Sequence, residues 1–255
     1  MDNPAMIMAA QDTLRSIKLT EDDDDVLNEI SLNSSNKHLA FSTDLGVVGV
    51  VDLSNMSIVR MKQKHASICG CVKFVPDRPR ELVSAGYDET FLHFDFLEGT
   101  CISKHEISSS QTQTTEGVSL SPPFIMSTAM SSTGILAAGT ADGHLWLGLG
   151  GQKGLGKDKI KRSKKWNGLS DEEKQVYVKV ADGPIVAMSF SAPTTLTAST
   201  LMGSIIQWEI TLGLDKVNAL VSNDTKIAIA GLTKDGKGII EIWDKSVPAH
   251  TSTSV

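Results

Sequence analysis

The chain has 255 residues, with 24 Lys and Arg against 30 Asp and Glu, which gives a formal net charge of −6. This balance argues against a protein coated with basic charge for nucleic-acid binding, and a hydrophobic content of 40% excludes a wholly disordered chain. Three cysteines are too few for a disulfide scaffold, and the sequence has no run of 18 apolar residues that could form a membrane-spanning helix. We therefore expect a globular protein of the nucleus, the cytoplasm or both, without a membrane partner.

Short segments in which apolar and polar residues alternate recur along the chain, and turn residues separate them. In chain order these predicted strands lie at 26–33, 38–42, 47–51, 68–75, 81–88, 90–96, 124–131, 135–143, 144–149, 175–180, 184–190, 195–200, 204–210, 216–222, 226–232 and 238–244. Alternation with many β-branched residues is typical of strands. The strands also group into larger units of about forty residues, the length of a four-stranded propeller blade.

Most of these units end their third strand on an aromatic residue followed by an acid, or on a pair that keeps only the acid. The pairs are Phe94-Asp95, Trp208-Glu209 and Trp243-Asp244, with Val51-Asp52 at the corresponding place in an earlier unit. The unit at 65–107 also carries His65, Ser84 and Asp88 ahead of Phe94. This pattern resembles the WD40-repeat family. The resemblance implies that His65, Ser84 and Asp88 form a blade-defining hydrogen-bonded set, which lacks the indole donor because Phe94 stands in place of Trp.

The resemblance implies an all-β, WD40-type β-propeller. At about forty residues per blade the chain holds about five to six blades, fewer than the seven that are usual in the family. We expect a single domain over 5–246 and a disordered tail over 247–255. Residues 5–19 resemble the middle strands of a blade whose first strand is missing, so the propeller is expected to be incomplete by one to two N-terminal blades. The alternative is that 5–19 closes a smaller ring.

A basic insertion over 150–175 interrupts one unit between its third and fourth strands. Its cations include Lys157, Lys159, Lys161, Arg162, Lys164 and Lys165, and Trp166 follows them. The net charge over 153–165 is +6, which leaves −12 on the rest of the chain. The segment is interpreted as a solvated loop, a nuclear import signal or a contact for nucleic-acid phosphates. Trp166 either stacks on a base or anchors the loop to the propeller, and a capping box predicts a short helix over 171–176.

Two further patterns resemble sites of chemistry, and neither is complete. The segment from Gly151 to Lys157 has the glycine spacing of a phosphate-binding loop, but Asp158 replaces the Ser or Thr that would hold Mg²⁺. Cys69 and Cys71 face the same way on a regular strand, yet their spacing is not that of a zinc knuckle, so both are expected in the core. We therefore predict no catalytic residues, no metal site, no cofactor and no small-molecule substrate.

The family resemblance implies a non-enzymatic scaffold or adaptor that binds other proteins. It also points to a substrate receptor of a cullin-4 ubiquitin ligase, docked on the ligase's adaptor. The motif for that docking is Trp-Asp-x-Arg at the end of a third strand, and here Leu97, Thr211 and Ser246 stand at the Arg position. The alternative is a nuclear protein that associates with nucleic acid through 153–165, although nucleic acid is not the expected partner.

Overall fold

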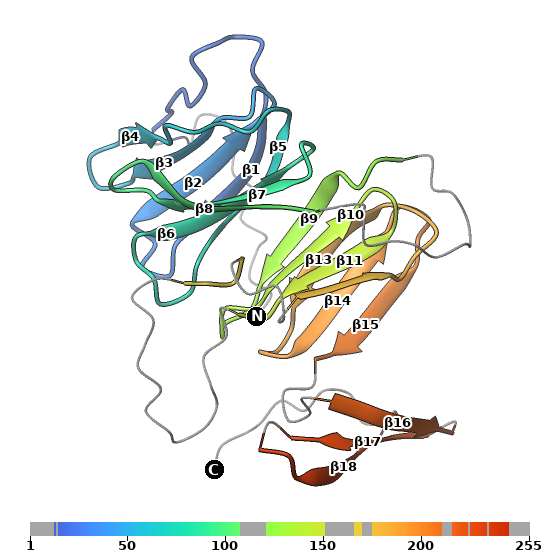
Figure 1. Cartoon of the computed structure of the whole chain (residues 1–255). Helices are drawn as coiled ribbons and strands as arrows, with labels where there is room; N and C mark the ends of the chain where they lie inside the picture. Colours follow the sequence, from blue (N-terminus) through green and yellow to red (C-terminus); the bar gives the residue numbers. More distant parts are fainter. Residues whose placement is uncertain are drawn as a thin grey trace, which may run out of the picture.

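The computed structural model describes residues 13, 15–107, 121–150, 166–169, 175–210, 216–223, 225–233 and 235–244. Within these ranges every regular element is a β-strand, and the strands form five antiparallel sheets (Figure 1). This confirms the all-β fold that the alternation predicts. The number of blades in a complete ring stays a prediction.

The first three sheets have four strands each, paired in chain order. The first contains β1 (Leu27–Leu32), β2 (His38–Thr43), β3 (Val48–Asp52) and β4 (Ser57–Arg60). The second contains β5 (Cys69–Phe74), β6 (Glu81–Gly86), β7 (Thr90–Asp95) and β8 (Thr100–Glu106). The third contains β9 (Ile125–Met130), β10 (Leu136–Thr140), β11 (His144–Gly148) and β12 (Gln175–Lys179). The long insertion therefore lies between β11 and β12, as the sequence indicates.

The last two sheets have three described strands each. The fourth contains β13 (Ile185–Phe190), β14 (Thr195–Thr200) and β15 (Ile205–Glu209), and the fifth contains β16 (Lys216–Ser222), β17 (Lys226–Leu232) and β18 (Gly238–Asp244). Tight turns join the strands, and several need a residue at positive φ. Gly143 is one: at φ 85° it turns the chain from β10 into β11, and a Cβ there would lie 2.0 Å from the Ala181 carbonyl oxygen.

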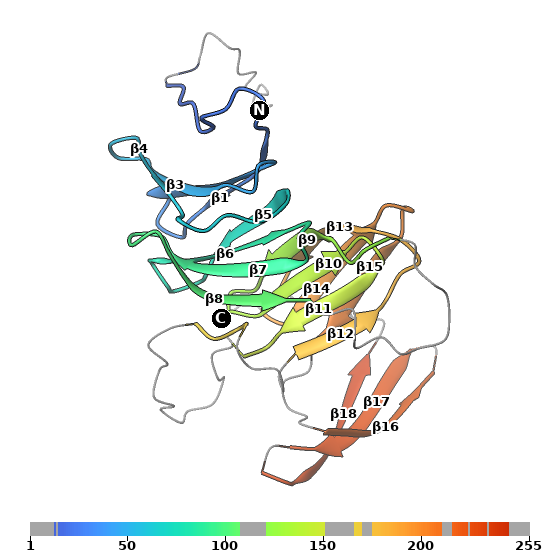
Figure 2. The ribbon, with the colours of Figure 1, turned by 45° about the horizontal axis from the view of Figure 1, so that its top comes forward.

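The first four sheets stack on one another through their first strands. β1 contacts β5, β5 contacts β9 and β9 contacts β13. The fourth strands of the first three sheets lie at the opposite, outer edge of each sheet. Figure 2 shows the four sheets arranged successively, with the fifth sheet apart from them in this view and in Figure 1.

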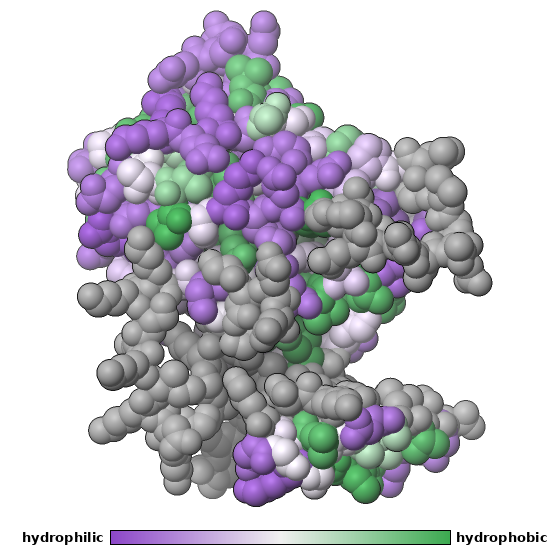
Figure 3. Space-filling view, in the orientation of Figure 1, coloured by the Kyte–Doolittle hydropathy of each residue, from purple (hydrophilic) through white to green (hydrophobic). Residues whose placement is uncertain are grey.

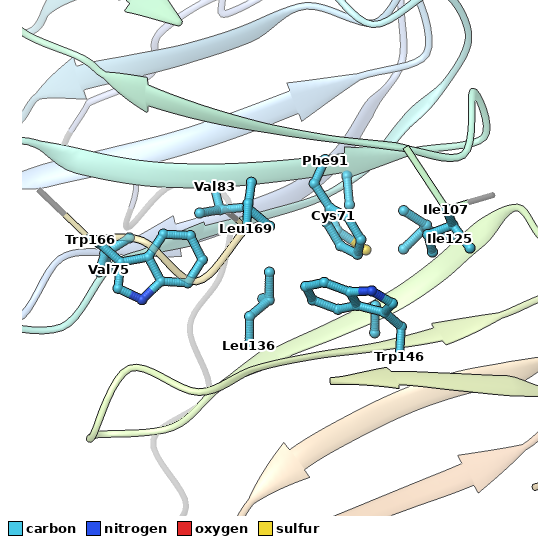
Figure 4. Close-up of a cluster of buried hydrophobic side chains, with 12 residues drawn as sticks. Cys71, Val75, Val83, Phe91, Ile107, Ile125, Leu136, Trp146, Trp166 and Leu169 are labelled. Atoms are coloured by element: carbon cyan, nitrogen blue, oxygen red, sulfur yellow. The ribbon is translucent and has the colours of Figure 1, made fainter. Parts of the chain in front are cut away.

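A separate apolar cluster fills each junction between neighbouring stacked sheets. Phe94 belongs to the cluster between the first and second sheets, and Leu145 to the cluster between the third and fourth. The cluster between the second and third sheets holds Phe91 and Trp146, whose ring centroids lie 4.5 Å apart (Figure 4). The core is thus divided into layers, and burial between sheets, at about 25 cal/mol per Å² of apolar surface, drives the stacking.

Two predicted elements differ from the structure. Residues 15–19 form no strand, and the rest of 5–19 lies outside the described residues apart from residue 13. The Leu19 carbonyl instead accepts a hydrogen bond from Arg60 Nη2 at 2.9 Å. The helix expected over 171–176 is wrong at its end, because Gln175 and Val176 pair with β11. Pairing along a sheet edge outweighs the local capping signal; residues 171–174 lie outside the described residues.

Candidate interaction site

The second sheet holds a buried hydrogen-bonded set of three side chains. His65, before β5, has its Nδ1 2.9 Å from Asp88 Oδ1 and its Nε2 2.7 Å from Ser84 Oγ. Ala66 N also donates to Asp88 Oδ2 at 2.9 Å. Burial raises the pKa of Asp88, but the hydrogen bonds from His65 and Ala66 outweigh it, so the pKa lies below its ordinary value. The set fixes the turn between β6 and β7 to the chain before β5.

Among the side chains that the structure describes, the aromatic and acidic residues that end the third strands do not join this hydrogen-bonded set. Phe94 lies at 0% exposure beside Leu82 and has no N–H to extend the set. Trp208, on β15, is half-buried against the third sheet. Trp243 and Asp244 occupy the last two positions of β18.

Trp166 anchors the part of the insertion that follows its basic run, between the second and third sheets. Its side chain is only 4% exposed and packs with Val83 and Leu136 (Figure 4). Its Nε1 donates to the Gly134 carbonyl at 2.9 Å, and its backbone N donates to Glu81 Oε2 at 3.0 Å. In this position the indole has no free face on which a nucleic-acid base could stack. The six cations from Lys157 to Lys165 lie outside the described residues.

Glu81 joins this anchor to the interior of the second sheet. The same Oε2 atom that accepts from Trp166 N lies 3.0 Å from His93 Nε2, and His93 is fully buried. Burial raises the pKa of Glu81, but the hydrogen bonds from His93 and Trp166 lower it by more. The pKa therefore lies below its ordinary value. An ionised Glu81 therefore holds the insertion at Trp166 against the second sheet.

Cys69 and Cys71 do not form a pair of ligands. A β-bulge between them shifts the register of β5 against β6, so Cys69 packs toward the first sheet and Cys71 toward the third. The expectation that both face the same way is wrong because the extra residue of the bulge breaks the alternation. Burial raises the pKa of Cys69 and raises that of Cys71 to about 12, which keeps both thiols neutral. Within the described ranges, no group of three or more metal-ligating side chains occurs.

A cleft of about 860 Å³ opens where the four inner strands end. Its wall contains residues from the ends of β1, β5, β9 and β13 and from the turns that follow. They are Ser31–Ser35, Lys73–Pro79, Thr128–Met130, Ser132 and Met188–Phe190. This cleft could not be predicted from the sequence, because its four parts are far apart along the chain. Only the stacking of the sheets brings them together.

The cleft offers apolar surface and hydroxyl groups. Phe74, Met130 and Phe190 give it adaptable apolar walls. Lys73 makes an ion pair with Glu29, whose Oε2 also accepts from Val72 N at 2.6 Å. This pairing neutralises the charge of Lys73, and the wall also carries one acid and one base, Asp77 and Arg78. The cleft thus combines apolar, hydroxyl and charged groups, which suits the side chains and backbone of a peptide.

Comparisons with known proteins agree with this architecture. No family model matches the chain. The chain is similar to the WD repeat-containing protein 53 homolog of Dictyostelium discoideum, at 30% identity over 121 residues, which cover 42% of this chain and 33% of that protein. The match thus spans about a third of the length of the curated relative. In the described part of the chain, no helix has the length and apolar character needed to cross a bilayer.

Proposed function

We propose that this chain is a member of the WD40-repeat family and a non-enzymatic scaffold or adaptor that binds other proteins. The cleft at the ends of the inner strands carries the proposal. It combines segments from four stacked sheets, so its shape is held by the core while its lining residues come from strand ends and turns. Recognition residues on loops above a rigid scaffold are typical of binding proteins.

The test is to identify partners by chemical crosslinking and mass spectrometry, and then to block the cleft. Ser34 and Ser132 are exposed and line the cleft, so Ser34→Arg and Ser132→Arg fill it without disturbing the core. Ser57→Arg, on the outer strand β4, is the matched control. We expect the two cleft variants to weaken partner binding at least about tenfold, while the control binds normally. Equal binding by all three variants would refute the cleft as the interaction surface.

We propose further that the partner is the adaptor of a cullin-4 ubiquitin ligase. The corner after β7 supports this. Asp95 ends β7 and accepts a hydrogen bond from Leu97 N at 3.1 Å. Leu97 stands at the Arg position of the docking motif, but Arg80 reaches the same corner from the neighbouring hairpin. Its Nη2 lies 2.9 Å from Asp95 Oδ2, and its side chain is 46% exposed. Arg80 thus presents a guanidinium beside the acid of the motif position.

Co-purification with the purified adaptor tests this role. We expect Arg80→Ala to reduce capture of the adaptor, because it removes the exposed guanidinium. Lys104→Ala, on the outer strand β8 of the same sheet, removes an equal charge elsewhere and leaves capture unchanged. If the wild-type chain captures no adaptor while a known receptor does, the ligase role is wrong.

We also propose that the protein resides in the nucleus and the cytoplasm and that the basic insertion acts as an import signal. Its net charge of +6 over 153–165 supports this. Neutralising Lys157–Lys165 should shift a fluorescent fusion toward the cytoplasm. The rival role in nucleic-acid binding instead requires DNA affinity that falls steeply with salt and disappears in the same variant.

A further inference from the structure

Among the described residues, the fourth sheet ends at β15, whereas each of the first three sheets continues to a fourth strand at that edge. The lengths of the connecting segments account for this difference. An outer strand lies within 53–68, within 96–124 and within 149–184, the segments that join the first four sheets in turn. Only 210–215 joins β15 to β16.

The segment 210–215 is too short to supply an outer strand. The shortest outer strand, β4, takes four residues, and a hairpin turn takes at least about two more. Ile210 cannot contribute to such a strand, because its N–H still bonds to the Thr194 carbonyl at 2.8 Å, as part of the pairing between β14 and β15. A fourth strand for this sheet must come from outside 210–215.

The backbone of β15 has hydrogen-bonding groups that point away from β14. Ile210 N bonds to Thr194 O, and the Ser204 carbonyl accepts from Thr200 N at 2.9 Å. Bonded pairs alternate along antiparallel strands, and in this register the intervening residues Ile205 and Gln207 direct their N–H and C=O groups outward. Among the described residues, β15 pairs with β14 alone. An unpaired edge of this kind is a template for a further strand.

The neighbouring third sheet provides an apolar wall beside this edge. Its outer strand β12 carries Val176 and Val178, which pair with Leu147 and Leu145. Those leucines pack in the same cluster as Trp208 of β15, so the valines face the fourth sheet. Val176 and Val178 are 40% and 44% exposed. A strand added to β15 would cover both valines, and Figure 3 shows hydrophobic surface over the fourth sheet.

The site fits a single extended segment better than a second copy of this chain. Two β15 strands paired antiparallel would be related by an axis perpendicular to the sheet, which keeps both third sheets on the same side. In the described part of the chain, the third sheet has one more strand than the fourth, so β12 extends beyond the edge of β15. Each copy's β12 would then occupy space that the other copy's third sheet already fills. A lone extended peptide meets no such obstacle.

We propose that the outer edge of β15 binds an extended segment of a partner protein as the fourth strand of the fourth sheet. The segment has apolar, preferably β-branched, side chains at alternate positions, which lie over Val176 and Val178, and polar side chains between them. Backbone hydrogen bonds to Ile205 and Gln207 fix its register, as in other cases of strand addition. The inference deepens the proposed binding function and rests on it, but it concerns a surface separate from the inner-strand cleft.

The test uses a fluorescent synthetic peptide in which valine and threonine alternate, with lysine at both ends, and measures its anisotropy with the full chain. Gln207→Pro removes one outward N–H from an edge strand, where proline is tolerated, whereas Gln207→Ala keeps it. We expect Gln207→Pro to weaken binding by about tenfold or more and Gln207→Ala to bind like the wild type. A peptide N-methylated on alternate residues should also fail to bind, which tests the backbone bonds without altering the protein.

Several outcomes would overturn the proposal. Binding that is insensitive to both Gln207→Pro and N-methylation would mean that the peptide does not join β15. Binding that appears only after removal of 245–255 would assign the edge to the chain's own C-terminal segment. A dimer that Gln207→Pro dissociates would assign it to a second copy. Ser132→Arg should leave peptide binding unchanged, so a failure at β15 is distinguishable from a failure of the proposed cleft.

Discussion

Replacing Trp166 by Ala should destabilise the protein by about 5 kcal/mol. A tryptophan buries roughly 150–250 Å², and at about 25 cal/mol per Å² this is worth about 4–6 kcal/mol. The side chain is 4% exposed, so nearly all of this contribution applies. The bond from Nε1 to the Gly134 carbonyl adds about 1 kcal/mol. The backbone bond to Glu81 remains in the variant, and large-to-small changes in cores typically cost about 3–5 kcal/mol.

Urea unfolding followed by far-ultraviolet circular dichroism measures this loss. Trp166→Phe keeps most of the packing and removes only the indole donor, so it should cost about 1–2 kcal/mol. Leu97→Ala, at a side chain that is 56% exposed, should cost less than about 0.5 kcal/mol. A Trp166→Ala loss as small as that of Leu97→Ala would refute the anchoring of the insertion between the second and third sheets.

Two further predictions follow from the buried titratable groups. The pKa of Asp88 is lower in the folded state than its ordinary 3.8, so its contribution to stability is present above that pH and is lost as the pH falls through the folded value. His65→Ala should flatten this part of the curve of unfolding free energy against pH; an unchanged slope would exclude the pair as its source. Burial raises the pKa of Cys69 and Cys71, so iodoacetamide at mildly alkaline pH should alkylate them only after unfolding, whereas the half-buried Cys101 reacts first. Peptide mapping that finds early labelling of Cys69 or Cys71 would contradict their burial.

Local alternation was sufficient to predict most strands, because each strand's pattern lies within a few residues. The outer strands β4 (Ser57–Arg60) and β8 (Thr100–Glu106) were not predicted, because both are only partly buried and their apolar runs are short. The bulge between Cys69 and Cys71 was also missed. A bulge adds one residue without changing composition, so the sequence pattern carries no sign of it, yet it sends the two thiols into different clusters.

Contacts between distant segments could not be predicted from the sequence. Trp166 bonds to Gly134, 32 residues away, and to Glu81, 85 residues away. The sequence left its role open between base stacking and anchoring. The inner-strand cleft depends in the same way on the stacking of four sheets. The His65, Ser84 and Asp88 set could be proposed because a family pattern supplied the missing long-range information.

A double-mutant cycle between Phe91 and Trp146 tests the stacking of successive repeat sheets most directly. The two rings belong to the second and third sheets, and their centroids lie 4.5 Å apart. Such aromatic pairs contribute about 0.5–1.5 kcal/mol beyond the area they bury. With Phe91→Leu, Trp146→Leu and the double variant, urea unfolding should give a coupling of about 1 kcal/mol. A coupling within about 0.3 kcal/mol of zero, as for independent sites, would contradict the face-to-face packing of these sheets.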